Sequence, residues 1–192
     1  CVSRHSGRLD ITLCLVTATN TKNQEVKFPM KISSIEGGVP APQRQVRVVL
    51  YSHDSLGLGH VRRNLLIAGA MSQSNPNVET LLISGTPYAS AYEIPKGTDI
   101  LSLPSLSKVE NGRYEPKRLR IGSRELTEFR ATTISAAIRS FRPDLFVVDK
   151  VPRGVCGELD PILRFLRDRT NTKVVLGLRD ILDDPNRVRS EW

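Results

Sequence analysis

The 192-residue chain is 39% hydrophobic and 25% charged, which excludes a fully disordered protein and suffices for one domain with a buried core. Its formal net charge of +8 is compatible with nucleic acid, anionic lipid or phosphorylated ligands and does not choose among them. Aromatic residues make up only 5% and are not interleaved with basic ones, which argues against nucleic acid as a partner, and no apolar run approaches the roughly 18 residues of a membrane span.

Residues 1–44 show no sustained periodicity and end in a cluster of glycine and proline over 37–42. We expect a poorly ordered extension and linker here, with an apolar run at 11–17 that is compatible with a strand. The three cysteines, Cys1, Cys14 and Cys156, are far apart and form no Cys-x-x-Cys motif. This pattern favours a reducing, cytoplasmic compartment without a bound metal, and we expect no cofactor.

From residue 45 onward, apolar strand-like runs alternate with segments of helical periodicity. The predicted strands are 45–52, 78–84, 99–103, 144–149 and 173–178, and the predicted helices are 58–73, 87–94 (short), 123–141 and 161–168. Residues 104–118 predict a loop or hairpin with an Asn111-Gly112 turn. Asp184-Pro185 predicts a further helix that the chain does not finish, so we expect 45–192 to be one domain truncated at its C-terminus.

Two of the helices have a clear apolar face. In the first, this face is formed by Leu58, Val61, Leu65, Ala68 and Met71. In the helix over 123–141, Ser123 is the expected N-cap, and the expected stripe is Leu126, Phe129, Ile134, Ala137, Ile138 and Phe141. Alternating strands and helices predict an α/β fold, a Rossmann-like parallel sheet with helices on both faces.

Ligands of such sheets bind beyond the carboxyl ends of the strands. Polar or small residues follow the predicted strands there, in the 52–60 loop, Ser84-Gly85, Pro104-Ser105, Asp149-Lys150 and Arg179-Asp180. Within the 52–60 loop, Gly57 and Gly59 are expected to allow positive φ angles and the close approach of a ligand. The loop leads into a helix N-terminus, which favours an anion such as a phosphate.

The loop is neither of the two common phosphate-binding motifs. Arg62 occupies the third glycine position of a dinucleotide-binding fingerprint, and Ser84-Gly85 stands where a ribose-binding acid is expected. No Walker A motif occurs in the chain.

Ser52-His53-Asp54 and the following Gly57-Leu58-Gly59-His60-Val61-Arg62-Arg63-Asn64-Leu65 resemble the N-terminal Gly-rich loop of GT-B glycosyltransferases. The nearest groups are predicted glycosyltransferases related to family 28. The G-x-G-H-x-x-R pattern is also similar to that of the nucleotide-sugar hydrolase of pseudaminic acid synthesis. It is close, too, to the Gly-Gly-His loop of the N-acetylglucosaminyltransferase that makes the peptidoglycan lipid precursor. The resemblance covers roughly 45–192, including FRPDLFVVD and LGLRDILDDP.

The resemblance implies the N-terminal, acceptor-side half of a GT-B fold. A second Rossmann-like domain, C-terminal and missing from this chain, would bind most of the nucleotide sugar, so we expect the isolated chain to be inactive. The implied substrates are a nucleotide sugar and a hydroxyl-bearing acceptor.

His60 is the candidate general base, because glycosyl transfer needs a group that takes the proton of the attacking hydroxyl. In the resembling hydrolase the matching histidine has this role with water. The alternative is that His60 only caps the helix or binds phosphate. The candidate substrate- or phosphate-binding residues are Ser52, His53, Asp54, Gly57, Gly59, Arg62, Asp149 and Arg179.

Each of these residues also has a purely structural interpretation. Asp54 and Asp149 could orient His60, or they could form an Asx-turn and end a strand. Arg62 and Arg63 could meet a diphosphate or stay solvated. Arg179 could line an interdomain cleft or pair with Asp180, and His53 is as compatible with a structural role as with a functional one.

Basic residues gather before and within the 123–141 helix, namely Lys117, Arg118, Arg120, Arg124 and Arg130. They could rest on an anionic membrane surface or form a solvated face.

The first hypothesis for function is thus a fragment of a glycosyltransferase. The alternatives are a nucleotide-sugar hydrolase and a non-catalytic domain that binds a separate partner subunit.

Overall fold

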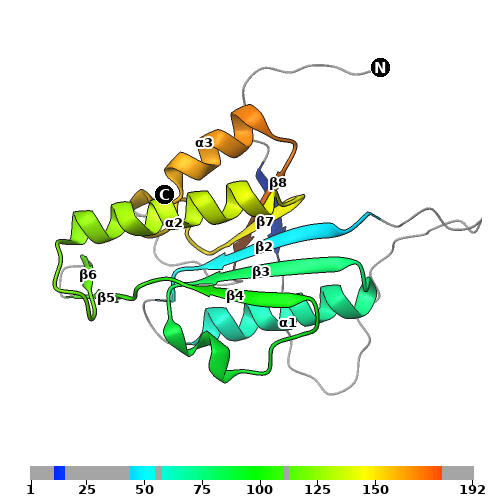
Figure 1. Ribbon diagram of the computed structural model, residues 1–192, viewed down its shortest axis with the longest axis horizontal. Coiled ribbons are helices and arrows are strands. Elements are labelled where there is room, and N and C mark those ends of the chain that lie inside the picture. Colours follow the sequence, from blue (N-terminus) through cyan, green and yellow to red (C-terminus); the bar gives the residue numbers. More distant parts are fainter. Residues whose placement is uncertain (1–10, 16–43, 55–57, 110–112, 179–192) are drawn as a thin grey trace, which may run out of the picture.

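The computed structural model of the protein describes residues 11–15, 44–54, 58–109 and 113–178 (Figure 1). Its large sheet consists of β1 (Ile11–Leu15), β2 (Val46–Ser52), β3 (Val78–Ser84), β4 (Thr98–Ser102), β7 (Leu145–Asp149) and β8 (Lys173–Leu178). The helices are α1 (Gly59–Ser74), α2 (Ser123–Phe141) and α3 (Asp160–Arg169), with 3₁₀ turns at Pro87–Ala91 and Val155–Gly157. A small antiparallel hairpin pairs β5 (Leu106–Lys108) with β6 (Tyr114–Pro116).

The six strands lie in the order β1-β8-β7-β2-β3-β4, and every neighbouring pair is parallel. The chain passes from β2 outward to β3 and β4 on one side, and it later returns to β7 on the other side of β2. The strand order therefore reverses between β2 and β7, and in open parallel sheets the carboxyl end of such a switch point is where ligands bind.

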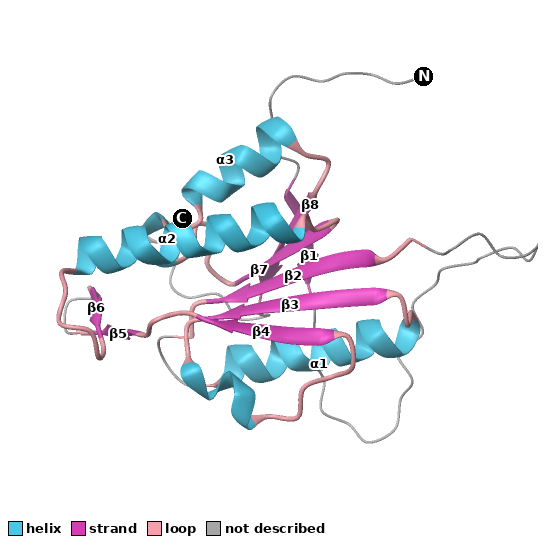
Figure 2. Cartoon of the chain, viewed as in Figure 1, coloured by secondary structure: helices cyan, strands magenta, loops and turns pink. Residues whose placement is uncertain are grey.

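Helices cover both faces of this sheet, as Figure 2 shows, with α1 on one face and α2 and α3 on the other. Successive residues of β2 point to opposite faces. Val48 and Leu50 pack in the cluster that includes Val61, Leu65 and Ala68 of α1. Val49 and Tyr51 pack in the other cluster, with Ile134 and Ile138 of α2 and Ile162 and Leu166 of α3. The expected α/β, Rossmann-like fold is confirmed.

Most predicted elements have the expected type and position. The ranges of β3, α2 and β8 agree with the prediction, the apolar run at 11–17 contains β1, and the segment over 87–94 is only a short 3₁₀ turn. The unfinished helix after residue 183 and the Asn111-Gly112 turn lie outside the described residues. The division of the chain at residue 44 stays a prediction.

Two predictions about α2 are wrong. Gly122 is the N-cap and no side chain caps the helix, so Ser123 is its first residue and not its cap. Phe129 is 54% exposed, whereas the buried residues are Leu126, Arg130, Ile134 and Ile138. The buried face follows a strict four-residue spacing, which places residue 130 inward and residue 129 about 100° away from it.

Among the described residues, no helix combines the length and apolarity that crossing a membrane requires.

Candidate functional site

The carboxyl ends of three adjacent strands bring the predicted polar residues together. Ser52 and Ser84 are directly paired at the ends of β2 and β3, and Asp149 ends β7 on the other side of β2. Helix α1 begins at Gly59, shortly after β2, so His60 is the second residue of the helix. The expected gathering of Ser52, His60, Ser84 and Asp149 at this edge is therefore what the fold produces.

His60 and Asp149 make the central contact. The Nδ1 atom of His60 lies 2.7 Å from Oδ2 of Asp149, and the side chains are 15% and 2% exposed. A carboxylate beside Nδ1 favours the tautomer in which Nδ1 carries the proton and donates it to the carboxylate. The lone pair of Nε2 then remains available to accept a proton from another molecule.

Arg63 completes this contact, and sequence reasoning gave it less weight than Arg62. Its Nη1 atom lies 3.2 Å from Oδ1 of Asp149, and its Nη2 donates to the carbonyl oxygen of Leu178 at 3.4 Å. Arg62, by contrast, is exposed. The signal that could have separated them is the spacing from His60, because residues three apart lie on the same face of a helix and residues two apart do not.

Asp54 contacts two serines. Its Oδ2 accepts hydrogen bonds of 2.7 Å from the hydroxyls of both Ser52 and Ser84. Burial raises the pKa of the Asp54 carboxyl, and the two serine hydrogen bonds partly oppose that rise. Of the two carboxylates considered as orienting groups for His60, Asp149 therefore makes the hydrogen bond and Asp54 binds the strand ends.

His53 is a buried neutral neighbour of His60. It is 8% exposed, and the centroids of the two imidazole rings are 5.6 Å apart. Burial, with a smaller contribution from the nearby His60, lowers the pKa of His53 from 6.5 to about 4. His53 therefore carries no charge at neutral pH, and its buried Nδ1 has no hydrogen-bond partner in the described part of the chain.

The expected role of Gly59 in the loop conformation is wrong. Gly59 opens α1 without a positive φ, and among the loop residues that the structure describes it is Asp54 that has a positive φ, at 47°. A Cβ atom added at Gly59 would meet nothing within 4 Å, so space for a ligand exists beside it. Gly57 and Arg179 lie outside the described residues. No group of three or more histidine, cysteine or acidic side chains in the described ranges could hold a metal ion.

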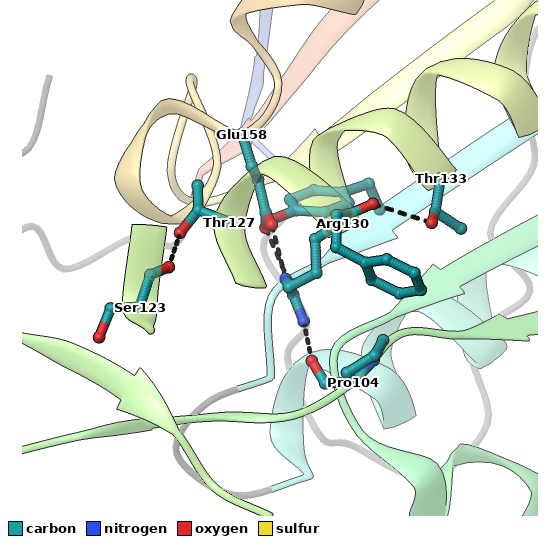
Figure 3. A network of polar contacts seen from close by, with 8 residues as sticks. Pro104, Ser123, Thr127, Arg130, Thr133 and Glu158 are labelled. Atoms are coloured by element: carbon teal, nitrogen blue, oxygen red, sulfur yellow. Dashed lines mark hydrogen bonds and ion pairs between the residues drawn. The ribbon is translucent and has the colours of Figure 1, made fainter. Parts of the chain in front are cut away.

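A second polar network lies buried between α2 and the sheet (Figure 3). Nε and Nη2 of Arg130 donate to the two carboxylate oxygens of Glu158 at 2.6 and 2.8 Å, and Nη1 donates to the Pro104 carbonyl at 2.6 Å. The Tyr51 hydroxyl donates to the same carboxylate. Arg130 is therefore a core ion pair and no part of the basic surface cluster, which corrects its predicted place there.

Comparison with known proteins finds no matching family model and no match among curated proteins. One similar solved structure is a UGT transferase from Siraitia grosvenorii in complex with UDP. It is 16% identical to this chain with a TM-score of 0.37, and the alignment covers 54% of this chain and 23% of the transferase. The C-terminal domain of a hydrogenase from Pyrococcus furiosus is 13% identical with a TM-score of 0.37, over 74% of this chain and 97% of its own. The chain thus spans about a quarter of the length of the first neighbour, and neither likeness assigns a function.

Proposed function

We propose that this chain is the acceptor-side half of a GT-B glycosyltransferase that transfers a sugar from a nucleotide sugar to a hydroxyl-bearing acceptor. The observation that carries this proposal is the His60–Asp149 hydrogen bond of 2.7 Å at the carboxyl edge of the sheet, beside the switch point. The resemblance of the G-x-G-H-x-x-R loop to that of GT-B enzymes supports the reaction class. A second domain or subunit supplies most of the nucleotide-sugar site.

In the proposed reaction, Nε2 of His60 takes the proton of the acceptor hydroxyl as its oxygen attacks the anomeric carbon. The bond from that carbon to the nucleoside diphosphate breaks, and the diphosphate leaves with the electron pair. Asp149 stabilises the imidazolium that forms, because its carboxylate is already hydrogen-bonded to Nδ1. Attack opposite the leaving group inverts the anomeric centre.

The other candidate residues divide by charge. Asp54 has no cationic partner among the described residues, so it suits a hydroxyl-bearing group better than a phosphate. We assign phosphate contacts to the α1 N-terminus with Gly57, Gly59 and Arg62, and to Arg179. Ser52 and His53 would line the acceptor side.

The first experiment uses the full-length protein. UDP-, GDP- and dTDP-sugars are screened by thermal shift, since a ligand that binds only the folded state raises Tm. The stabilising donor is then incubated with and without candidate acceptors, and the products are analysed. A glycoside formed only with an acceptor supports the transferase, free sugar formed without one identifies the hydrolase, and donor binding without either product identifies a non-catalytic domain.

The second experiment tests the residues. His60→Gln is expected to lower kcat by about 10²–10⁴-fold, the usual contribution of a general base. Asp149→Asn should lower kcat by about 10²-fold or more, because it disturbs the His60 tautomer. Asp144→Asn is the matched control, since Asp144 precedes the same strand at its other end and binds the backbone N–H of Arg47 there. Unchanged turnover in His60→Gln would refute the assignment.

A further inference from the structure

We infer that Arg63 is a positioning residue for the His60–Asp149 pair and that Gly177 is the position that makes room for it. This inference rests on the proposed function only for its effect on turnover. Its structural content is the orientation and tautomer of the His60 ring, which can be measured whether or not the protein transfers sugar.

The two oxygens of Asp149 are divided between two residues of one helix. His60 uses Oδ2 at 2.7 Å, and Arg63 lies one turn later with Nη1 at 3.2 Å from Oδ1. The second contact is an ion pair without the alignment of a good hydrogen bond. Through Nη2, Arg63 also donates to the carbonyl of Leu178, the last residue of β8. Arg63 therefore connects α1 to the ends of both β7 and β8.

Gly177 explains how the guanidinium fits. It is the direct partner of Asp149 in the β7–β8 register, and it is the residue before Leu178, which ends β8. A Cβ atom at this position would lie 3.0 Å from Nη2 of Arg63. Glycine inside a strand packs less surface than other residues and often marks the close approach of another group. Here the approaching group is the Arg63 guanidinium.

The position of Arg63 has a consequence for His60. The Asp149 side chain is 2% exposed, and a buried carboxylate without a compensating charge is costly. Arg63 compensates that charge and restrains the carboxylate from the side that His60 does not use. A fixed, charged Asp149 accepts the hydrogen bond of the Nδ1 proton of His60. Nε2 then stays unprotonated, and its lone pair has a fixed direction.

The primary test is nitrogen-15 NMR of the histidine rings in the protein at neutral pH. The chain has three histidines, and His60→Gln identifies the signals of His60. In the wild type, we expect the form protonated on Nδ1 to dominate. In Arg63→Met, the signals should move toward a mixture of both tautomers. The signals of Arg63→Lys should lie between those of the wild type and Arg63→Met, because lysine keeps the charge but lacks the planar guanidinium.

Gly177→Ala tests the same inference without removing Arg63. The new methyl group displaces the guanidinium by a few tenths of an ångström, so the His60 signals should shift in the same direction as in Arg63→Met and by less. Arg167→Met is the control, because Arg167 also pairs with a carboxylate, that of Asp168, but lies on the exposed end of α3. It should leave the His60 signals unchanged.

Turnover gives the second readout. If the proposed transfer occurs, Arg63→Met should lower kcat by about 10-fold with KM within about twofold, because a positioning role affects the reaction step more than binding. A purely structural role would lower Tm while the folded variants keep the wild-type His60 tautomer, and that result would overturn the inference. Failure of the transferase assay with the expected NMR result would overturn only the proposed function.

Discussion

The Cβ position of Gly85 falls 1.8 Å from the carbonyl oxygen of His53. Gly85 follows β3, and its backbone N–H donates to the carbonyl of Ser52 at 3.0 Å. The chain after β2 and the chain after β3 are thus in contact through their backbones at the site edge. Only glycine permits this approach, because the neighbouring atom is backbone and cannot rotate away.

Gly85→Ala should therefore destabilise the protein by about 3 kcal/mol, the upper end of the cost of overpacking. For a chain of this size that corresponds to a fall in Tm of about 10 °C, measured by thermal unfolding. Gly59→Ala is the matched control. Its methyl group enters open space on a helix, so it should raise stability by about 0.5 kcal/mol, and an equal loss in both variants would contradict the explanation.

The Arg130–Glu158 pair leads to a second stability prediction. Both side chains are fully buried, so Arg130→Met leaves the Glu158 carboxylate without its cation and should cost about 3–5 kcal/mol. The measurement is chemical unfolding at neutral pH. Arg124→Met is the control, because its ion pair with Glu128 is exposed and should be worth less than about 0.5 kcal/mol.

A double variant separates the ion pair from the packing of Arg130. Arg130→Met combined with Glu158→Gln removes both charges, so its loss of stability should be smaller than the sum of the two single losses. Additive losses would show that the charges of Arg130 and Glu158 are not coupled.

The lowered pKa of His53 predicts a pH dependence of stability. Above pH 6.5 the ring is neutral in both the folded and the unfolded state and contributes nothing. Between pH 6.5 and about 4, only the unfolded state takes up the proton, so the free energy of unfolding should fall by about 3 kcal/mol over this range. Below pH 4 both states are protonated and the fall ends.

The measurement compares unfolding of the wild type and His53→Gln at several pH values. As the pH falls from 7 to 4, the wild type should lose about 3 kcal/mol of unfolding free energy relative to His53→Gln. Asp54 acts in the opposite direction, because its raised pKa lets the folded state take up a proton first, but it is present in both proteins and cancels. Parallel curves over this range would disprove the role of His53.

Much of this fold follows from local pattern. Apolar runs bounded by turn residues identify the strands, and parallel strands necessarily bring Ser52, Ser84 and Asp149 to one edge. The contact between His60 and Asp149 spans 89 residues and could be named only as one of two choices. Local periodicity says which residues end strands at the same edge, but not which side chains meet there.

The errors have a common physical origin in long-range partners. The sequence predicts a surface position for Arg130 because its partner Glu158 is 28 residues away, beyond the reach of any helical spacing rule. The apolar side chain of Phe129 predicts an inward position, whereas the four-residue spacing of the buried face excludes it. In this turn of α2 the charged Arg130 is therefore buried and the apolar Phe129 is exposed, because the ion pair compensates the buried charge.

The exposed basic segment before α2 gives the last prediction. Lys117, Arg118, Leu119 and Arg120 are all exposed, and they lie at the end of the molecule where the β5–β6 hairpin meets the start of α2 (Figure 1). Each basic residue near an anionic membrane contributes about 1 kcal/mol, so Lys117→Gln with Arg120→Gln should weaken binding to phosphatidylserine vesicles by about 30-fold in sedimentation.

Arg167→Gln with Arg169→Gln removes the same charge from the last turn of α3 and should have little effect. Binding of basic side chains to an anionic membrane is electrostatic, so the same hypothesis predicts that added salt abolishes the wild-type binding. Binding that ignores salt, or that falls equally in both double variants, would show that this segment is only a solvated face.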